Sequence, residues 1–227
     1  DPIARLLAAK LEFRRRRNHH GAVDVRATLR ASMSTGGIPI DLRRRKPRPG
    51  KPELVVICDV SGSVAGFSQF TLQLVYALRQ QFSHVRVFAF VDTVDEVTEF
   101  FDRGNSDEQF GERMTRMLSE ASISTRDGHS DYGHMLKGFE DRYGDSLTHR
   151  SALLILGDAR NNFRPTHADA LAKMRDRVRN AYWLNPERES SWDSGDSDAS
   201  KYGAVVDMFE CRNADQLSKV IAELLPV

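Results

Sequence analysis

Three oxygen-bearing side chains at alternate positions directly follow an apolar run. The run is Leu54–Cys58, and Asp59, Ser61 and Ser63 come after it. One carboxylate and two hydroxyls are hard oxygen ligands, which favour Mg²⁺ or Mn²⁺ and are also compatible with Ca²⁺. Asp and Ser are also common at helix starts, where their oxygens accept backbone N–H groups. The five-residue pattern by itself therefore leaves open whether these residues bind a cation or cap a helix.

Two later stretches place further oxygen atoms at the boundaries of predicted elements. Ser130, with His129 and Asp131 beside it, lies in a polar turn before a helical pattern, and Asp158 ends a second apolar strand. Ligands of open α/β sheets bind outside the carboxyl ends of the strands, where the following loops meet. We therefore expect Ser130 and Asp158 to converge with the first three residues on one cation.

The elements that would position these residues alternate between strands and helices. The predicted strands cover 53–59, 85–91, 94–101, 151–157, 180–184 and 204–209. The predicted helices cover 23–34, 67–81, 110–121, 167–179 and 214–225, and one more follows the turn at 127–133 and ends near 142. Continuous apolar strands indicate burial of both faces, and the alternation indicates βαβ units. The predicted fold class is α/β, with a mostly parallel central sheet between helical layers.

The longest predicted connection, 185–203, is rich in Ser and Asp and carries Trp192. A connection of this length inside a compact domain is usually functional or disordered. It leaves a strand at the edge that would hold the cation, so we consider Trp192, together with His129 and Asp131, a candidate partner contact. The alternatives are that Trp192 anchors its own loop and that His129 is simply solvated.

Positive charge is concentrated at the start of the chain. Residues 1–51 carry 14 Lys or Arg against 4 Asp or Glu, whereas the remainder carries 19 against 28. Clustered cations give affinity for phosphates, so binding of an anionic polymer through this segment is an alternative function. Phe13 is the only Phe, Tyr or Trp in this segment, so the segment has few rings that could stack on bases. We therefore favour the interpretation that its positive charge balances the acidic remainder of the chain over nucleic-acid binding. We divide the chain into a basic lead-in, 1–51, partly packed on a domain at 52–227.

The cysteines and the hydropathy indicate the compartment. Cys58 and Cys211 form no Cys-x-x-Cys pattern, and we expect both on strands as buried thiols in a reducing compartment. No apolar run approaches the roughly 20 residues that span a bilayer. We therefore predict a soluble, cytoplasmic protein. The chain starts at Asp1 rather than Met, which indicates a fragment or a processed chain.

Four motifs, taken in order, resemble the von Willebrand factor type A (VWA) domains of the CoxE-like family. They are Thr35–Ile40, Cys58–Ser63, Ile155–Asn162 and Leu184–Glu187. The resemblance covers most of the chain from about Gly21 and implies a three-layer Rossmann-like fold. It also implies a metal-ion-dependent adhesion site at the carboxyl edge of the strands, built from Asp-x-Ser-x-Ser, a Thr and an Asp. Ser130 stands at the Thr position and keeps the hydroxyl, although serine restricts its rotamer less.

The same resemblance implies a function and a role for each site residue. Ser61, Ser63 and Ser130 would coordinate the cation directly, while Asp59 and Asp158 would act mainly through waters. A partner's Asp or Glu would complete the coordination. CoxE-like proteins act with MoxR-type AAA+ ATPases, often in maturing metalloenzymes such as molybdenum hydroxylases. The implied function is a metal-dependent protein-binding adaptor between such an ATPase and a client metalloenzyme.

A phosphohydrolase of the haloacid-dehalogenase type is the alternative enzyme, because it also has an Asp at the end of its first strand. That chemistry needs a second carboxylate two residues later as acid and base, and here Ser61 occupies the position. The chain also lacks a Gly-x-x-x-x-Gly-Lys-Ser/Thr phosphate loop and a Gly-x-Ser-x-Gly nucleophile elbow. We therefore predict binding rather than catalysis.

Overall fold

The computed structural model describes residues 53–62, 74–75, 84–101, 110–123, 129–213 and 215–217. Several sequence predictions lie outside these residues and stay predictions. They are the basic lead-in at 1–51 with its motif Thr35–Ile40 and its helix 23–34, the site residue Ser63, and most of the helices 67–81 and 214–225.

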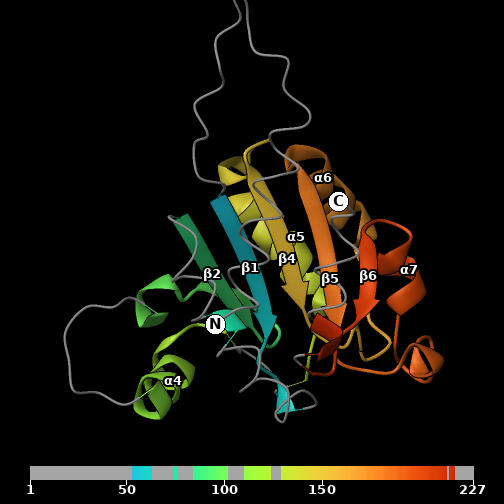
Figure 1. Ribbon diagram of the computed structural model, residues 1–227, viewed down its shortest axis with the longest axis horizontal. Coiled ribbons are helices and arrows are strands. Elements are labelled where there is room, and N and C mark those ends of the chain that lie inside the picture. The colour runs from blue at the N-terminus through green and yellow to red at the C-terminus, as the bar shows by residue number, and fades with distance from the viewer. Residues whose placement is uncertain are drawn as a thin grey trace, which may run out of the picture.

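A six-stranded sheet forms the centre of the described part, in the order β3-β2-β1-β4-β5-β6 (Figure 1). The strands are β1 (Glu53–Asp59), β2 (His84–Phe90), β3 (Val94–Glu96), β4 (Ser151–Leu156), β5 (Asn180–Asn185) and β6 (Asp207–Glu210). Only β3 runs antiparallel to its neighbour, and the other pairs are parallel. The mostly parallel α/β sheet predicted from the sequence is confirmed.

Helices and short 3₁₀ turns connect the strands. They are α4 (Phe110–Glu120), α5 (Tyr132–Tyr143), α6 (Ala168–Arg177), α7 (Ala199–Gly203), η3 (Thr98–Phe101), η4 (Gly144–Ser146) and η5 (Glu189–Ser191). Among the described residues, no helix has the length and apolar character needed to cross a membrane.

Two predicted strands and the position of one cysteine differ from expectation. The strand expected at 94–101 is limited to β3, because the Thr98 hydroxyl accepts the Val87 N–H and η3 follows. The strand expected at 204–209 begins later, as β6, because α7 and the turn after it occupy the preceding residues. Cys211, predicted to lie on a strand, is just beyond β6, although it is buried.

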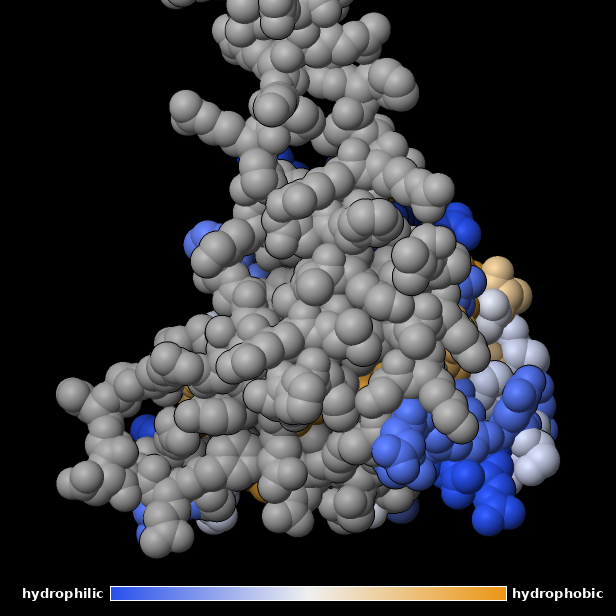
Figure 2. All heavy atoms as spheres, in the orientation of Figure 1, coloured by the Kyte–Doolittle hydropathy of each residue, from blue (hydrophilic) through white to orange (hydrophobic). Residues whose placement is uncertain are grey.

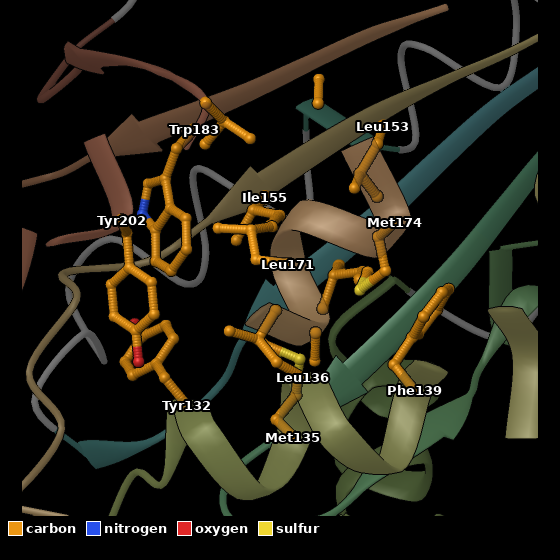
Figure 3. Packing of buried hydrophobic residues seen from close by; sticks show 14 of the residues in the cluster. Tyr132, Met135, Leu136, Phe139, Leu153, Ile155, Leu171, Met174, Trp183 and Tyr202 are labelled. Carbon is orange, nitrogen blue, oxygen red and sulfur yellow. The ribbon is translucent and has the colours of Figure 1, made fainter. Parts of the chain in front are cut away.

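Both faces of the sheet are covered by apolar side chains. Leu54 and Val56 of β1 belong to the cluster on one face, and Val55 and Ile57 belong to the cluster on the other. This alternation follows from the strand geometry, in which successive side chains point to opposite faces. Figure 3 shows part of the second cluster, to which α5 and α6 contribute. The continuous apolar pattern of β1 thus reflects burial from two sides.

An aromatic group packs at the carboxyl end of the sheet, on the face that α5 covers. The rings of Trp183 and Tyr202 stack with centroids 4.8 Å apart, and the Tyr132 ring lies 5.4 Å from that of Trp183 (Figure 3). Phe90 meets Tyr132 edge-on at 5.0 Å. All four side chains are buried. These contacts fix the ring of Tyr132, the first residue of α5, beneath the edge where β1 and β4 end.

Candidate functional site

Asp59, the last residue of β1, is the centre of the hydrogen bonds at this edge. Its side chain is buried, and its Oδ1 accepts the backbone N–H of Ser61 at 2.8 Å. Its Oδ2 accepts hydrogen bonds from the hydroxyls of Ser130, at 3.3 Å, and Tyr132, at 2.6 Å. The two oxygens of one carboxylate therefore bring together the turn after β1 and the start of α5, 71 residues apart between Asp59 and Ser130.

Asp158 reaches the same place from the neighbouring strand. It follows β4 after Gly157 and is buried, and its Oδ1 accepts the Tyr132 hydroxyl at 3.2 Å and the backbone N–H of Arg160 at 2.9 Å. A Cβ on Gly157 would collide with the Tyr132 hydroxyl and lie 3.0 Å from the Cβ of Asp59. The glycine in the motif is thus required by the close approach of the tyrosine.

The charge of Asp158 disfavours ionisation of the Asp59 carboxyl group. Burial, and then the charge of Asp158, raise the pKa of Asp59 to about 6, although hydrogen bonds from Ser61 and Tyr132 act in the opposite direction. Burial and the same two carboxylates raise the pKa of Tyr132 well above its ordinary value. The phenol therefore keeps its proton at neutral pH and acts as a hydrogen-bond donor.

The chemistry of these residues fits a divalent cation. Asp59 accepts its hydrogen bonds from neutral groups, and a second buried carboxylate, that of Asp158, lies close to it. A cation at this position would offset the negative charge of the two buried carboxylates. The hydroxyl-bearing residues Ser61 and Ser130 are buried beside it. Within the described ranges, no group of three or more His, Cys, Asp or Glu side chains could hold a metal. Any cation here would depend on serine hydroxyls, and Ser63 lies outside the described residues.

The loop after Asp158 contributes contacts that the sequence analysis did not assign. Asn161 is fully buried, with its Oδ1 accepting the Gly133 N–H at 3.2 Å and its Nδ2 donating to the Arg164 carbonyl at 2.6 Å. Asn162 donates to the backbone carbonyl of Ser130 at 2.8 Å. Paired asparagines after Asp158 were visible in the motif, but only the fold shows that they bind the start of α5.

The sequence was compared with models of protein families. The model described as "VWA domain containing CoxE-like protein" matches residues 2–220. The chain belongs to this family.

The CoxE-like chain is also similar to several solved structures. A von Willebrand factor type A protein from Catenulispora acidiphila is 14% identical, with a TM-score of 0.48 over 78% of this chain and 42% of that one. Proximal thread matrix protein 1 from the mussel byssus is 12% identical, with a TM-score of 0.49 over 77% of this chain and 47% of that one. BatB from Bacteroides thetaiotaomicron is 13% identical, with a TM-score of 0.46 over 76% of this chain and 96% of that one. The chain spans less than half the length of the first two. No curated protein matches it.

The three candidate partner contacts of this CoxE-like chain have different surroundings. His129 is exposed next to the site. Asp131 is buried, and its carboxylate caps α5 through the His134 N–H at 2.8 Å and pairs with Arg164 at 3.2 Å. Trp192 is half-buried and packs against the cluster that α5 covers, which fits the alternative that it anchors its own loop. Of these residues, His129 has the most accessible side chain.

The long segment after β5 emerges at the same edge, as predicted, and is tied to it. Asn185 is buried and donates to the backbone carbonyl of Asp158 at 3.1 Å. The Arg160 guanidinium pairs with Glu187 at 2.7 Å and with Asp196 at 2.8 Å. The segment also contains η5 and α7, which the sequence analysis did not predict. Figure 2 shows hydrophilic residues gathered at the lower right, where this segment lies.

Proposed function

We propose that this chain is a metal-dependent protein-binding domain. It holds Mg²⁺ or Mn²⁺, with Ca²⁺ a weaker fit, at a metal-ion-dependent adhesion site formed by Asp59, Ser61, Ser63, Ser130 and Asp158. The observation that carries the proposal is the convergence of two buried carboxylates and two buried serines on one hydrogen-bonded cluster. Membership of the CoxE-like VWA family supports it.

The residues of the cluster would have distinct tasks. The bound cation would supply positive charge that attracts a carboxylate of a partner protein. Asp59 holds the Ser130 hydroxyl and the backbone of Ser61 in place, and Asp158 fixes the Tyr132 hydroxyl from the neighbouring strand. The serine hydroxyls would serve as neutral ligands, which leaves the charge of the cation incompletely offset.

The wider role follows from the family resemblance. We propose that the chain is an adaptor that binds a MoxR-type AAA+ ATPase and a client metalloenzyme, and that it does not itself catalyse a reaction. The basic lead-in at 1–51 would belong partly to this domain. We further propose that the adaptor acts in the cytoplasm. Cys58 and Cys211 are both free and buried in this structure, and their thiols would stay reduced there.

Calorimetric titration tests the cation site. Mg²⁺ and Mn²⁺ are titrated into the chelator-treated full chain, its Ser61→Ala variant and its Ser130→Ala variant. Ser119→Ala is the matched control, because Ser119 is exposed on α4 and its hydroxyl donates to the backbone carbonyl of Arg116, one turn earlier. We expect saturable binding that both site variants lose and the control keeps. Binding that survives in the site variants would reject this position for the cation.

A binding assay tests the adaptor role. A purified MoxR-type AAA+ ATPase from the same source is passed over the immobilised full chain with Mg²⁺, with chelator, and with an Asp158→Asn variant. Asp145→Asn is the control, because that carboxylate is fully exposed on η4, between α5 and β4. We expect binding that chelator and Asp158→Asn abolish. No binding with Mg²⁺ would reject the ATPase partnership, and binding that persists in chelator would reject its dependence on the metal.

A further inference from the structure

Phe163 is a large apolar side chain held out into solvent beside the proposed cation site. It is 84% exposed, and among the described residues only Leu118, at 50%, is another exposed large hydrophobic side chain. Phe163 directly follows Asn162, whose side chain donates to the Ser130 carbonyl at 2.8 Å. A single exposed apolar residue is ordinary on a protein surface. The backbone around this one is not ordinary.

The chain adopts a left-handed conformation to present this side chain. Asn162 has φ 50° and Phe163 has φ 58°. Asparagine tolerates this region, whereas a phenylalanine in it is strained by contact between its Cβ and the following carbonyl. Exposure of the ring also forgoes the stabilisation that its burial would give. Strain of this kind persists only where the surroundings impose it, and it occurs preferentially at functional positions.

The surroundings do fix the loop that carries Phe163. Asn161, on one side, donates to the Arg164 carbonyl at 2.6 Å and accepts the Arg164 backbone N–H at 3.0 Å. Arg164, on the other side, pairs with Asp131 at 3.2 Å. A Cβ on Gly133 would collide with the Pro165 carbonyl, so the loop also lies directly on the first turn of α5. The ring is therefore preorganised rather than carried by a loose loop.

We propose that Phe163 is the apolar anchor for the protein partner whose carboxylate meets the cation. The inference rests on the proposed function and specifies the partner surface further. The partner would present an acidic side chain to the cation and, beside it, an apolar pocket or apolar side chains that cover the Phe163 ring. Preorganised aromatic side chains are common binding hot spots, because little conformational entropy is lost when they are buried. A bound cation would attract a single carboxylate of a protein, whereas the buried carboxylates of Asp59 and Asp158 beneath it disfavour an extended anionic surface such as a membrane or a nucleic acid.

Selection of peptides on the protein itself tests this inference without a known partner. Phage-displayed random peptides are selected on the full chain with Mg²⁺, and the affinities of the selected peptides are measured by fluorescence polarisation for four proteins. These are the unmodified chain, Phe163→Asn, Asp158→Asn and the control Leu118→Gln. Asparagine tolerates positive φ, so Phe163→Asn removes the ring and keeps the loop. Circular dichroism and thermal unfolding verify that each variant is folded.

We expect peptides with an acidic residue next to apolar ones, whose affinity falls at least about tenfold in Phe163→Asn and less than about twofold in Leu118→Gln. Peptides that depend on Mg²⁺ and Asp158 but bind Phe163→Asn normally would overturn the anchor and leave the proposed function intact. Peptides that depend on Phe163 but not on Mg²⁺ would support the anchor and reject the metal-dependent part of the function. Failure to select any peptide sensitive to either residue would overturn both.

Discussion

The hydroxyl of Tyr132 donates a hydrogen bond of 2.6 Å to Oδ2 of Asp59, although 73 residues separate them in the chain. The same hydroxyl lies 3.2 Å from Oδ1 of Asp158. A phenol has one proton, so it donates fully to only one of two carboxylates at a time. Without a cation, the two carboxylates therefore compete for this proton.

Replacement of Asp59 by Asn should stabilise the cation-free protein. The amide would donate to the Tyr132 oxygen, which would then donate to Asp158, and the repulsion between two carboxylates would disappear. Because the pKa of Asp59 is raised from 3.8 to about 6, we expect a gain of roughly 1–3 kcal/mol above pH 7. Urea unfolding in chelator measures it. Added Mg²⁺ should stabilise the unmodified protein and leave Asp59→Asn unchanged.

The pH dependence of that gain distinguishes its cause. A carboxyl group whose pKa is raised by folding contributes stability that is fully present below its ordinary pKa of 3.8 and is lost as the pH rises through about 6. The advantage of Asp59→Asn in chelator should therefore shrink as the pH is lowered from 7 towards about 4. An advantage of the same size at every pH would show that charge repulsion is not its source.

Replacement of Tyr132 by Phe should destabilise the protein, most strongly without a cation. The ring contacts with Phe90 and Trp183 would remain, but two buried carboxylates would lose a donor. A hydrogen bond to a charged group contributes about 1.5–3 kcal/mol, so we expect a loss of that size in chelator and a smaller loss with Mg²⁺. Tyr202→Phe is the control, because its hydroxyl donates to a neutral backbone carbonyl. Equal losses in the two variants would contradict this prediction.

Replacement of Gly157 by Ala should disturb the site through packing. The added Cβ would collide with the Tyr132 hydroxyl, and we expect a loss of about 1–3 kcal/mol and weaker Mg²⁺ binding. Gly203→Ala is the control, since its Cβ would meet only the Cβ of Met208, at 3.8 Å. Addition of Tyr132→Phe to Gly157→Ala should cost less than it does in the unmodified chain, because the colliding oxygen is gone. Strictly additive losses in denaturant unfolding would refute the collision.

Replacement of Arg160 by Lys should loosen the segment after β5. The guanidinium donates to both oxygens of Glu187, at 2.7 and 3.0 Å, and to Asp196, and an ammonium group does not reproduce this fork. We expect trypsin to cleave after Arg188 several-fold faster, while global stability changes by about 1 kcal/mol or less, because these side chains are partly solvated. Arg175→Lys, at an exposed ion pair, should leave the cleavage rate unchanged. Equal cleavage of both variants would argue against the clamp.

The sequence alone was sufficient to predict the strands and the turn that carry Asp59, Asp158 and Ser130. A strand buried on both faces must be apolar at every position, so the run before Asp59 and the run before Asp158 identified two parallel inner strands. Parallel strands end at one edge, and therefore the two carboxylates had to lie near each other. Local chemistry also placed Ser130 in the turn before α5. In the structure the Ser130 hydroxyl donates to Asp59, and the Tyr132 hydroxyl lies within hydrogen-bond distance of both Asp59 and Asp158.

Other features depended on contacts between segments that are far apart in the chain. A tyrosine at the start of an amphipathic helix is typical of a core residue, and nothing local shows that the hydroxyl of Tyr132 meets two carboxylates. Its position depends on the packing of its ring against Trp183 and Tyr202 and on the missing side chain of Gly157. These are long-range steric relationships, and hydrophobic periodicity carries no information on them.

The sequence thus determined which residues stand at the carboxyl edge of the sheet, because strand periodicity and strand ends are local properties. Only the tertiary structure decided which of them face one another and which face solvent. Trp192, conspicuous in the sequence, packs on the core, whereas Phe163 is exposed because Asn161 and Asn162 bind the start of α5 and hold its backbone at positive φ. Whether a side chain is exposed depends on contacts between segments that are far apart in the sequence, and these contacts form only in the folded chain.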